Sequence, residues 1–541
     1  MKKRIPAIVV GFVMAIAAVV IALQPPSPGV GEYFPGGRNI EAYRYEHAKG
    51  NPPFPDKANF IGTLNGDWYQ MGKQFGERAG ESTRYVSDIW WKAECELWGK
   101  IETLKAFELY EDQIKALDPG LVDFMRGISD GASPWLNASL YADPNHPLYG
   151  TNYQRVLAVN LWDEWTMQHP RNFPDGSSTF GGSVTAPEKL CLAGCSAFAA
   201  RGKATMQGEV ISAHNRHSDF DPRTYEQVYI LKPFQGNTCW VLTNSPQVAA
   251  NQVVNHKGVS ISLLYGGATN PWSLDYNGES YCAEGFGVPW FHLFLYVGIH
   301  ANSAKEAIDM LTKGTPKYRK KTGRDSLLRG GGWIFLVADE DILAVVETTA
   351  NRYAVRYAGD VLPFTGPEWC DSYYIVATNH FICDFSYDEH NNLTDVPMTI
   401  FSDGYHYNPS TGEILGLDES GLRFWTLMWD MKHNYGRIDR YRAQQIMSGV
   451  YAYDKDTGDK IEAAEDEEGY CRIYGTIGPC TLGWISMQGG TCDAKIAVLY
   501  GKDTIVTWTL GNPSDWQGAW DEYQFNVSDD QGAYLQYKMQ N

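Results

Sequence analysis

The pattern of apolar and polar positions changes from helical to strand-like near residue 190. Before that point, residues 62–118 carry apolar side chains every three or four positions with few Gly or Pro breaks, and residues 153–168 repeat the pattern. A period of three to four residues predicts amphipathic helices. After that point, short runs rich in β-branched and aromatic residues alternate with turn residues, which predicts strands. The chain therefore changes from a helical part to a mostly β part.

The predicted strands form a long series, and helices interrupt it only in clusters. Helical periodicity returns at residues 289–313 and near residues 422–432. Helices in clusters, instead of one after each strand, favour an α+β sandwich over a doubly wound parallel sheet. The predicted strands cover residues 195–202, 209–215, 226–234, 238–246, 258–266, 332–341, 342–349, 352–359, 373–381, 480–488, 494–500 and 504–510.

The first residues combine a basic start with an apolar run. Lys2, Lys3 and Arg4 precede 19 apolar-rich residues at positions 5–23, and a Pro-rich break follows. This arrangement is typical of an export signal or of a single membrane anchor. Both interpretations stay open, because no small-x-small cleavage site stands out. In either case residues 1–25 predict that the body of the protein lies outside the cytoplasm.

Composition narrows the classes of partner and of site. The 64 acidic and 45 basic residues give a formal net charge of −19, which argues against nucleic acid as a partner because phosphate binding needs a basic surface. The ten cysteines are too sparse for a disulfide scaffold, and no C-x-x-C pair suggests a zinc ribbon or a thioredoxin-type site. The sequence also lacks a phosphate-binding loop and a dinucleotide fingerprint, and we expect no cofactor.

One stretch, residues 190–220, concentrates candidate chemistry. A Gly/Ser/Pro-rich connection at residues 170–190, which we expect to be flexible, leads into the first predicted strand. Cys195 lies at that junction, between Gly194 and Ser196. A cysteine in an exported protein is most often a disulfide partner or a small core residue. A thiol at the start of a strand after a flexible loop also fits a nucleophile, and composition leaves these alternatives open.

The stretch GCSAFAARGKATMQGEVISAHN, residues 194–215, resembles the penicillin acyltransferase family of autoproteolytic N-terminal-nucleophile hydrolases. Members combine Gly-Cys-Thr/Ser, an apolar strand, a GxATxxG turn and a second strand that ends in a polar cluster; the turn here is GKATMQG. The resemblance continues in order from residue 62 to residue 430. The matching segments are GDWYQMGKQFGERAG, MRGISDGA, LAVNLWDEW, VVNHKGVSISL, GVPW, AKEAIDML, VATNHF and SGLRFWTLM.

The resemblance implies an α+β fold, namely a four-layer αββα sandwich at residues 195–541 preceded by a helical pro-segment at residues 26–194. It also implies self-processing. The Cys195 thiolate attacks the carbonyl of Gly194, the acyl group moves from nitrogen to sulfur, and hydrolysis leaves Cys195 as a new N-terminus. Its α-amine then acts as the base for its own thiol. The implied reaction is hydrolysis of an amide bond in a small acylated compound, or acyl transfer from it, and the two pieces are expected to stay associated.

The resemblance also assigns three further residues to the site. Asn379 in VATNHF matches the family's oxyanion donor, Asn255 in VVNHKG matches an Asn beside the free amine and the oxyanion, and Arg423 in SGLRFW matches an Arg near the nucleophile. Each has a structural alternative. Asn is common in turns between strands, and an Arg near a helix start is often a surface residue.

One place departs from the family pattern. After the second strand the family has Arg, two residues and then Asp, whereas AHNRHSD puts His214 at the Arg position and His217 at the Asp position. The Asp orients the nucleophile or its amine; His217 could replace it, Asp219 could move inward, or the site could be altered. The more distant phospholipase-B-like relatives also carry His at the first position. Two His three residues apart, without a Cys or carboxylate motif, fall short of a zinc site.

Two other functions stay open at this point. A phospholipase-B-like lipid deacylase would share the fold, and the high aromatic content suits an acyl-chain pocket. An inactive exported relative that serves as a surface binding protein would explain the two His substitutions. An intact precursor would favour that second alternative, and a free Cys195 N-terminus would argue against it. Contact with a membrane is expected only through the N-terminal segment.

Overall fold

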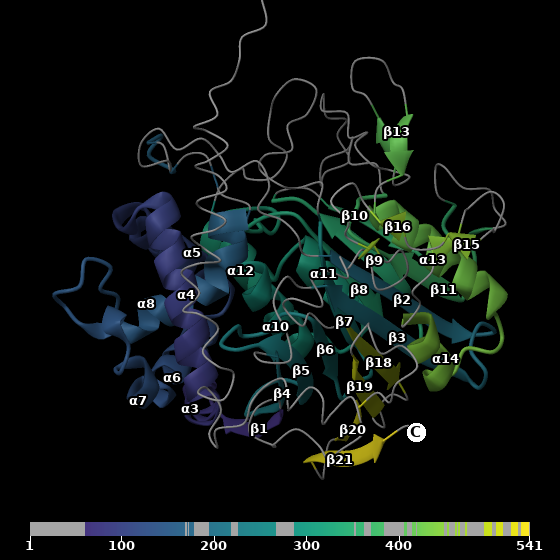
Figure 1. The fold of residues 1–541 in the computed structure, drawn as a ribbon, viewed down its shortest axis with the longest axis horizontal. Helices are drawn as coiled ribbons and strands as arrows, with labels where there is room; N and C mark the ends of the chain where they lie inside the picture. Colours follow the sequence, from purple (N-terminus) through teal and green to yellow (C-terminus); the bar gives the residue numbers. More distant parts are fainter. Residues whose placement is uncertain are drawn as a thin grey trace, which may run out of the picture.

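Figure 1 shows, in the computed structural model, a mixed helix and strand protein with open sheets. This architecture is compatible with the α+β class that the sequence predicts. The described residues are 60–167, 170, 173–177, 194–217, 226–266, 286–350, 353–361, 369–382, 405–407, 414–417, 419–447, 452–453, 460–461, 464–465, 471–472, 492–499, 505–511, 521–528 and 532–539.

Helices fill the first part of the described chain and return in two later groups. Reciprocal capping boxes fix two of the helix starts, formed by Asp67 with Gln70 before α3 and by Thr151 with Gln154 before α8. The helices are α3 (Trp68–Arg78), α4 (Gly80–Trp98), α5 (Lys100–Leu117), α6 (Pro119–Gly131), α7 (Ser133–Leu136), the 3-10 turn η1 (Leu140–Ala142), α8 (Asn152–Trp162), the π-helix η2 (Asp163–Met167), α10 (Trp290–His300), α11 (Ala304–Thr312), α12 (Pro316–Thr322), α13 (Glu419–His433) and α14 (Arg440–Met447).

The strands form two large sheets and three two-stranded ones. The first sheet has the order β1-β4-β5-β6-β7-β8-β9-β10 and the second the order β11-β2-β3-β18-β19-β20-β21. The strands are β1 (Phe60–Gly66), β2 (Gly194–Gly202), β3 (Gly208–His217), β4 (Glu226–Pro233), β5 (Cys239–Asn244), β6 (Gln252–Asn255), β7 (Ser260–Tyr265), β8 (Trp333–Ala338), β9 (Leu343–Thr348), β10 (Tyr353–Tyr357), β11 (Tyr374–Ala377), β12 (Tyr405–Tyr407), β13 (Ile414–Leu417), β14 (Ala452–Tyr453), β15 (Lys460–Ile461), β16 (Ala464–Glu465), β17 (Cys471–Arg472), β18 (Cys492–Leu499), β19 (Ile505–Gly511), β20 (Asp521–Ser528) and β21 (Gly532–Met539).

Most of the predicted elements are present. The predicted strands between residues 195 and 381 and those between 494 and 510 all form, as do the predicted helices at 153–168, 289–313 and 422–432. Paired strands of the two large sheets run antiparallel, with β1 and β4 as the parallel exception among the described pairs, which agrees with the prediction against a doubly wound parallel sheet. The predicted strand at 480–488, the N-terminal segment 1–25 and most of the connection 170–190 lie outside the described residues.

Residues 62–66 are a strand, and the prediction of a helix from residue 62 was wrong there. β1 pairs in parallel with β4 at the edge of the first sheet. Gly62 and Gly66 adopt positive φ angles of 86° and 127°, which an α-helix excludes and glycine tolerates. The apolar periodicity of α3 had been extended over them, although the helix begins only after its Asp67 cap.

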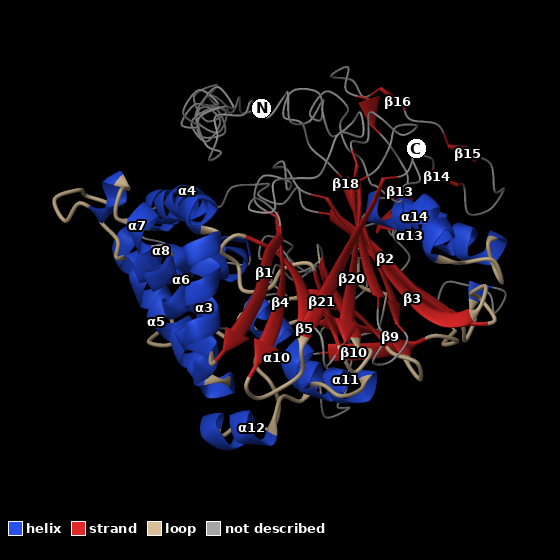
Figure 2. Cartoon of the chain, turned by 90° about the horizontal axis from the view of Figure 1, so that it is seen from below, coloured by secondary structure: helices blue, strands red, loops and turns tan. Residues whose placement is uncertain are grey.

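Three apolar clusters pack these elements together. The largest joins helices α3–α8, α10 and α11 to one face of the first sheet, as where Phe75 of α3 meets Tyr229 of β4 with ring centroids 5.5 Å apart. The second lies between the two sheets and contains Ala197 of β2 and Leu264 of β7. The third joins the other face of β2, which carries Phe198 and Ala200, to α13 and α14. Figure 2 shows α3–α8 on one side of the strands and α13 and α14 on the other.

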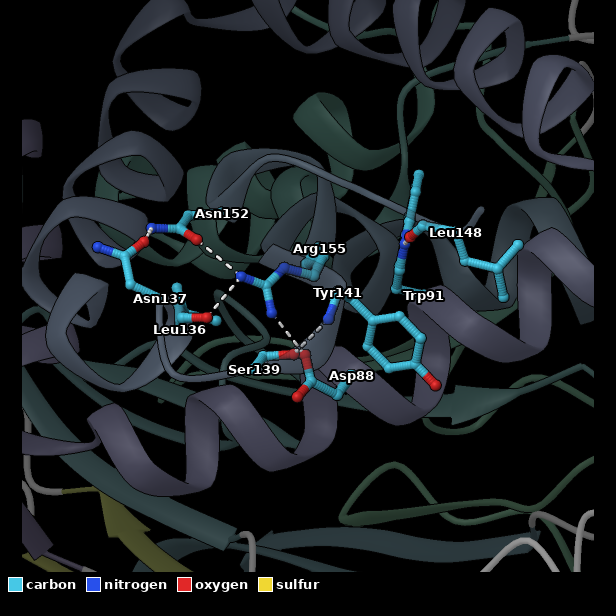
Figure 3. Close-up of polar contacts among 9 residues, drawn as sticks. All are labelled: Asp88, Trp91, Leu136, Asn137, Ser139, Tyr141, Leu148, Asn152 and Arg155. Carbon is cyan, nitrogen blue, oxygen red and sulfur yellow. Dashed lines mark hydrogen bonds and ion pairs between the residues drawn. The ribbon is translucent and has the colours of Figure 1, made fainter. Parts of the chain in front are cut away.

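A buried arginine holds the helical part together (Figure 3). Arg155 of α8 places its Nη1 2.6 Å from Asp88 Oδ1 on α4, and its Nη2 donates to the carbonyl oxygen of Leu136 at 2.8 Å and to Asn152 Oδ1 at 2.7 Å. Burial raises the pKa of Asp88 even with this partner in place. Removing one partner of a buried ion pair leaves the other charge buried without compensation. Arg155 therefore fixes α8 against α4.

Within the described residues, no helix combines the length and apolar character needed to cross a membrane.

Candidate active site

Cys195 lies near the start of β2, an inner strand of its sheet between β11 and β3. Its backbone is opposite Arg216 of β3, and Gly194 is opposite His217. The side chain belongs to the apolar cluster between the two sheets and is 7% exposed. Cys195 forms no disulfide in the described structure. Two alternatives from the sequence therefore remain for it, a core residue and a nucleophile.

The backbone nitrogen of Cys195 is held by the side chain of Asn379. The Cys195 N–H donates to Asn379 Oδ1 at 2.6 Å, and Asn379 Nδ2 donates to the carbonyl oxygen of Tyr265 at 2.7 Å. Asn379 follows β11 and Tyr265 ends β7, so the amide bridges the two sheets beside Cys195. Both Asn379 and Tyr265 are buried, which shields these bonds from water and strengthens them.

A guanidinium completes the cluster and fixes the orientation of the Asn379 amide. Arg423 of α13 is buried; its Nη2 donates to Asn379 Oδ1 at 2.7 Å, and its Nη1 donates to the carbonyl oxygen of Cys195 and, at 3.1 Å, to Ser196 Oγ. Asn379 Oδ1 thus meets two groups that can only donate, while its Nδ2 meets a carbonyl that can only accept. A flipped amide would lose all three bonds. The backbone of Cys195 is therefore held on both its N–H and its carbonyl by side chains from distant parts of the sequence.

The structure thus brings together three of the residues that the sequence predicts for the site, Cys195, Asn379 and Arg423. In one respect the geometry differs from the expectation for Asn379. The sequence predicts that Asn379 donates to an oxyanion, whereas here its oxygen holds the nitrogen of Cys195 and its Nδ2 already donates to Tyr265. That bond uses one of the two hydrogens on Nδ2, so the oxyanion role stays a prediction.

His214 shares the face of Cys195, and His217 is described only through its backbone. His214 is fully buried and lies opposite Ala197, two residues beyond Cys195 on the same side of β2. It therefore points towards the first sheet, as Cys195 does. The backbone of His217 lies opposite Gly194, and its side chain is outside the described residues, as is Asp219. Whether a histidine takes the place of the family's Asp stays a prediction.

Asn255 has a structural role in the described contacts. Its Nδ2 donates to the carbonyl oxygens of Gly298 and Ala301 at 2.8 Å each, and its Oδ1 accepts from the N–H groups of Lys257 and Val259. These four bonds close the turn between β6 and β7 and tie it to the end of α10. They do not reach Cys195, so the predicted place of Asn255 beside the amine finds no support in these contacts.

The loop that carries Asn379 contains a buried neutral histidine. Burial, with the cations Arg423 and Arg356 nearby, lowers the pKa of His380 to about 3. Its Nδ1 lies 3.3 Å from Thr378 Oγ1. A base that weak carries little proton near neutral pH, so His380 serves as a neutral packing and hydrogen-bonding group. His380 is therefore a poor candidate for a general base near neutral pH.

Sequence reasoning missed four residues around this cluster, namely Tyr265, Glu347, Arg356 and His380. Glu347 and Arg356 form an ion pair, with Arg356 Nε 3.2 Å from Glu347 Oε1. A signal was present for this pair, because each is an ionisable residue inside an otherwise apolar strand, and such residues are buried only with a partner. Tyr265 contributes its backbone carbonyl, for which side-chain patterns carry no signal.

Two further carboxyl groups are buried in the helical part, apart from the residues bonded to Cys195. Glu94 of α4 and Glu164 of η2 are both fully buried. Glu164 Oε1 accepts from the Trp290 N–H at the start of α10, at 2.7 Å, whereas neither oxygen of Glu94 has a hydrogen-bond partner in the described structure. Burial raises both pKa values well above the ordinary 4.5. Burial therefore favours the protonated, neutral form of both groups.

Glu94→Gln is expected to stabilise the protein increasingly as pH rises. Above pH 4.5 an unfolded Glu94 releases its proton and the folded one keeps it, so the free energy of unfolding falls by up to about 1.4 kcal/mol per pH unit until the raised pKa is reached. Gln does not titrate, so urea unfolding should show a gain in the variant at pH 8 that vanishes near pH 4. Glu108→Gln, at an exposed position on α5, is the matched control. Equal pH dependence in wild type and Glu94→Gln would contradict the prediction.

Neither a metal site nor a known family changes this description. Among the described residues, no three His, Cys, Asp or Glu side chains come close enough to hold a metal ion. No protein-family model matches the chain, and no curated protein sequence matches it. The family resemblance carried by the motifs therefore stays a prediction, and what the site can do follows from its contacts.

Proposed function

We propose that the chain is a self-processing N-terminal-cysteine hydrolase that cuts itself between Gly194 and Cys195 and then hydrolyses an amide bond of a small acylated compound. One observation carries the proposal: the backbone nitrogen of Cys195 is held by Asn379 and its carbonyl oxygen by Arg423. A core cysteine needs its backbone bonded only to neighbouring strands. A residue whose nitrogen is to become a catalytic amine needs that nitrogen fixed beside its thiol.

We further propose that the layers form the four-layer αββα sandwich of N-terminal-nucleophile hydrolases. Support comes from the three apolar clusters, which pair helices with the first sheet, the two sheets with each other, and the second sheet with α13 and α14. Residues 195–541 would be the catalytic part. Residues 26–194 would be a pro-segment that stays bound, because β1 pairs with β4 and helices α3–α8 share the largest cluster.

The proposed cut proceeds without a second protein. The Cys195 sulfur attacks the carbonyl carbon of Gly194, and the thiol proton passes to the Cys195 nitrogen as the carbon–nitrogen bond breaks. The product is a thioester between Gly194 and the Cys195 sulfur, and water hydrolyses it to a Gly194 carboxylate and a free thiol. Glycine at position 194 suits the close approach, since it has no Cβ. Asn379 Oδ1 accepts from the nitrogen of Cys195 before the cut and can keep doing so afterwards.

In the proposed turnover, the amine of Cys195 takes the proton of its own thiol, and the thiolate attacks the substrate carbonyl. The Arg423 guanidinium shares Asn379 Oδ1 with that nitrogen. A fixed cation so close disfavours protonation of the amine before the reaction, which leaves the amine able to accept the thiol proton, and it stabilises the thiolate that forms. Water then hydrolyses the acyl-enzyme, or an amine accepts the acyl group if the enzyme is a transferase.

The N-terminal residues 1–25 support the proposal that the body of the protein lies outside the cytoplasm.

The mass of the purified protein tests the proposal directly. Under denaturing, reducing conditions we expect two pieces, the larger of which begins Cys-Ser-Ala-Phe. Under native conditions they should elute together. A folded sample that consists of one chain with the bond between Gly194 and Cys195 intact would contradict the proposal and favour an inactive binding protein.

A further inference from the structure

The loop that carries Asn379 is anchored at both ends by one buried ion pair. Glu347 Oε2 accepts from the Ile382 N–H at 2.8 Å, and Arg356 Nη2 donates to the carbonyl oxygen of Val376. Asn379 lies midway between these two anchor points along the chain. Arg356 Nε and Glu347 Oε1 are 3.2 Å apart, so a single pair sets both ends of the segment.

The pair also joins the two sheets. Glu347 is on β9 and Arg356 on β10, neighbouring strands of the first sheet, whereas Val376 is on β11 of the second. Glu347 and Arg356 are both buried, and each would be left as an uncompensated charge without the other. Because the pair is buried and bonded to both ends of the loop, the position of the loop depends on the positions of β9 and β10. The loop in turn places Asn379 Oδ1 2.6 Å from the nitrogen of Cys195.

We propose that Glu347 and Arg356 are positioning residues, which set the Asn379 amide onto the nitrogen of Cys195. This inference rests on the proposed self-processing of the chain. The two residues touch neither the bond to be cut nor the thiol in their described contacts, and they act through Asn379. Small displacements of a catalytic group are costly, since about 1 Å can lower a rate by about 10²-fold.

Two conservative variants test the pair while keeping both charges, so that the folded precursor persists. Glu347→Asp shortens the acid by one methylene group and should pull it away from the Ile382 N–H. Arg356→Lys replaces a planar fork by a single ammonium group, which cannot hold Glu347 and the Val376 carbonyl with the same geometry. Each should slow the cut by about tenfold or more. The measurement is the first-order rate of cutting in precursor made by cell-free translation, which needs no substrate.

A matched control separates positioning from general stability. Arg155→Lys makes the same change in another buried arginine that bonds a carboxylate and a backbone carbonyl, those of Asp88 and Leu136. It should lower the urea midpoint by an amount similar to Arg356→Lys and leave the cutting rate of the folded precursor within about twofold of wild type. An equal slowing by Arg155→Lys would overturn the positioning role.

A double-mutant cycle with Asn379→Ala gives the sharper readout. If Glu347 and Arg356 act through Asn379, then Arg356→Lys should have no further effect on the cutting rate once Asn379 is Ala. Independent, additive losses would show a structural role only and overturn the inference, as would wild-type cutting rates in both conservative variants. A wild-type chain that never cuts would instead remove the proposed function itself, which keeps the two failures distinct.

Discussion

Cys195→Ala is expected to remain one uncut chain without amide hydrolase activity. No thiol is then left to attack the carbonyl of Gly194, and no N-terminal amine is formed to act as the base. The substitution removes only a sulfur atom from the cluster between the sheets, so the variant should fold. Denaturing gels and intact mass report the cut, and circular dichroism reports the fold.

Cys191→Ala is the control for this variant, because it removes a neighbouring thiol to which no chemical role is assigned. It should be cut at the wild-type position and rate. Normal processing of Cys195→Ala would show that another group breaks the chain, and the nucleophile interpretation of Cys195 would then fail. A wild-type Cys195 found in a disulfide would have the same consequence.

Asn379 is expected to have two separable roles: it holds the nitrogen of Cys195 for the cut, and it donates to the oxyanion during turnover. Two substitutions distinguish these roles. Asn379→Ala should lower turnover by about 10²–10³-fold, the usual loss for an oxyanion donor, and should also slow the cut because Oδ1 no longer holds the nitrogen of Cys195. Asn379→Asp keeps an oxygen for that nitrogen and for Arg423 but loses the Nδ2 donor. It should therefore cut faster than Asn379→Ala and still hydrolyse fluorogenic N-acyl amides poorly.

The control for these variants is Asn160→Ala. Asn160 is another buried Asn, whose Nδ2 donates to the backbone carbonyls of Val156 and Pro246 and whose Oδ1 accepts from the Val248 N–H. Its loss should cost comparable stability and leave cutting and hydrolysis of the folded protein unchanged. Near-normal cutting and turnover in Asn379→Ala would show that Asn379 is only a turn residue, which is the structural alternative given for it above.

The sequence predicts the strands well because their apolar positions and turn residues are local signals. The same locality explains the error at residues 62–66. β1 contains two glycines and pairs with β4, which lies far away in the sequence. The helical periodicity that follows β1 was therefore extended over a strand that is stabilised by pairing with a distant segment.

The convergence of Cys195, Asn379 and Arg423 was predictable only through the ordered motifs, since the residues lie more than 40 positions apart from one another. The exact bonding was not. Which atom of Asn379 faces Cys195 depends on where the Tyr265 carbonyl and the Arg423 guanidinium lie in space. The pair of Glu347 with Arg356 depends likewise on the register of β9 with β10, and a sequence without alignment does not fix a register.

The parallel pairing of β1 with β4 has a consequence for how the processed protein would denature. In an uncut chain, β1 and β4 belong to one molecule, and each is supplied to the other at the high effective concentration of a tether. After a cut before Cys195 they belong to two polypeptides, and unfolding releases two molecules from one. The denaturation midpoint would then rise with protein concentration by mass action, and dilution would oppose reassembly. The precursor would thus refold after denaturation at any concentration low enough to avoid aggregation, whereas the mature protein would lose that reversibility on dilution.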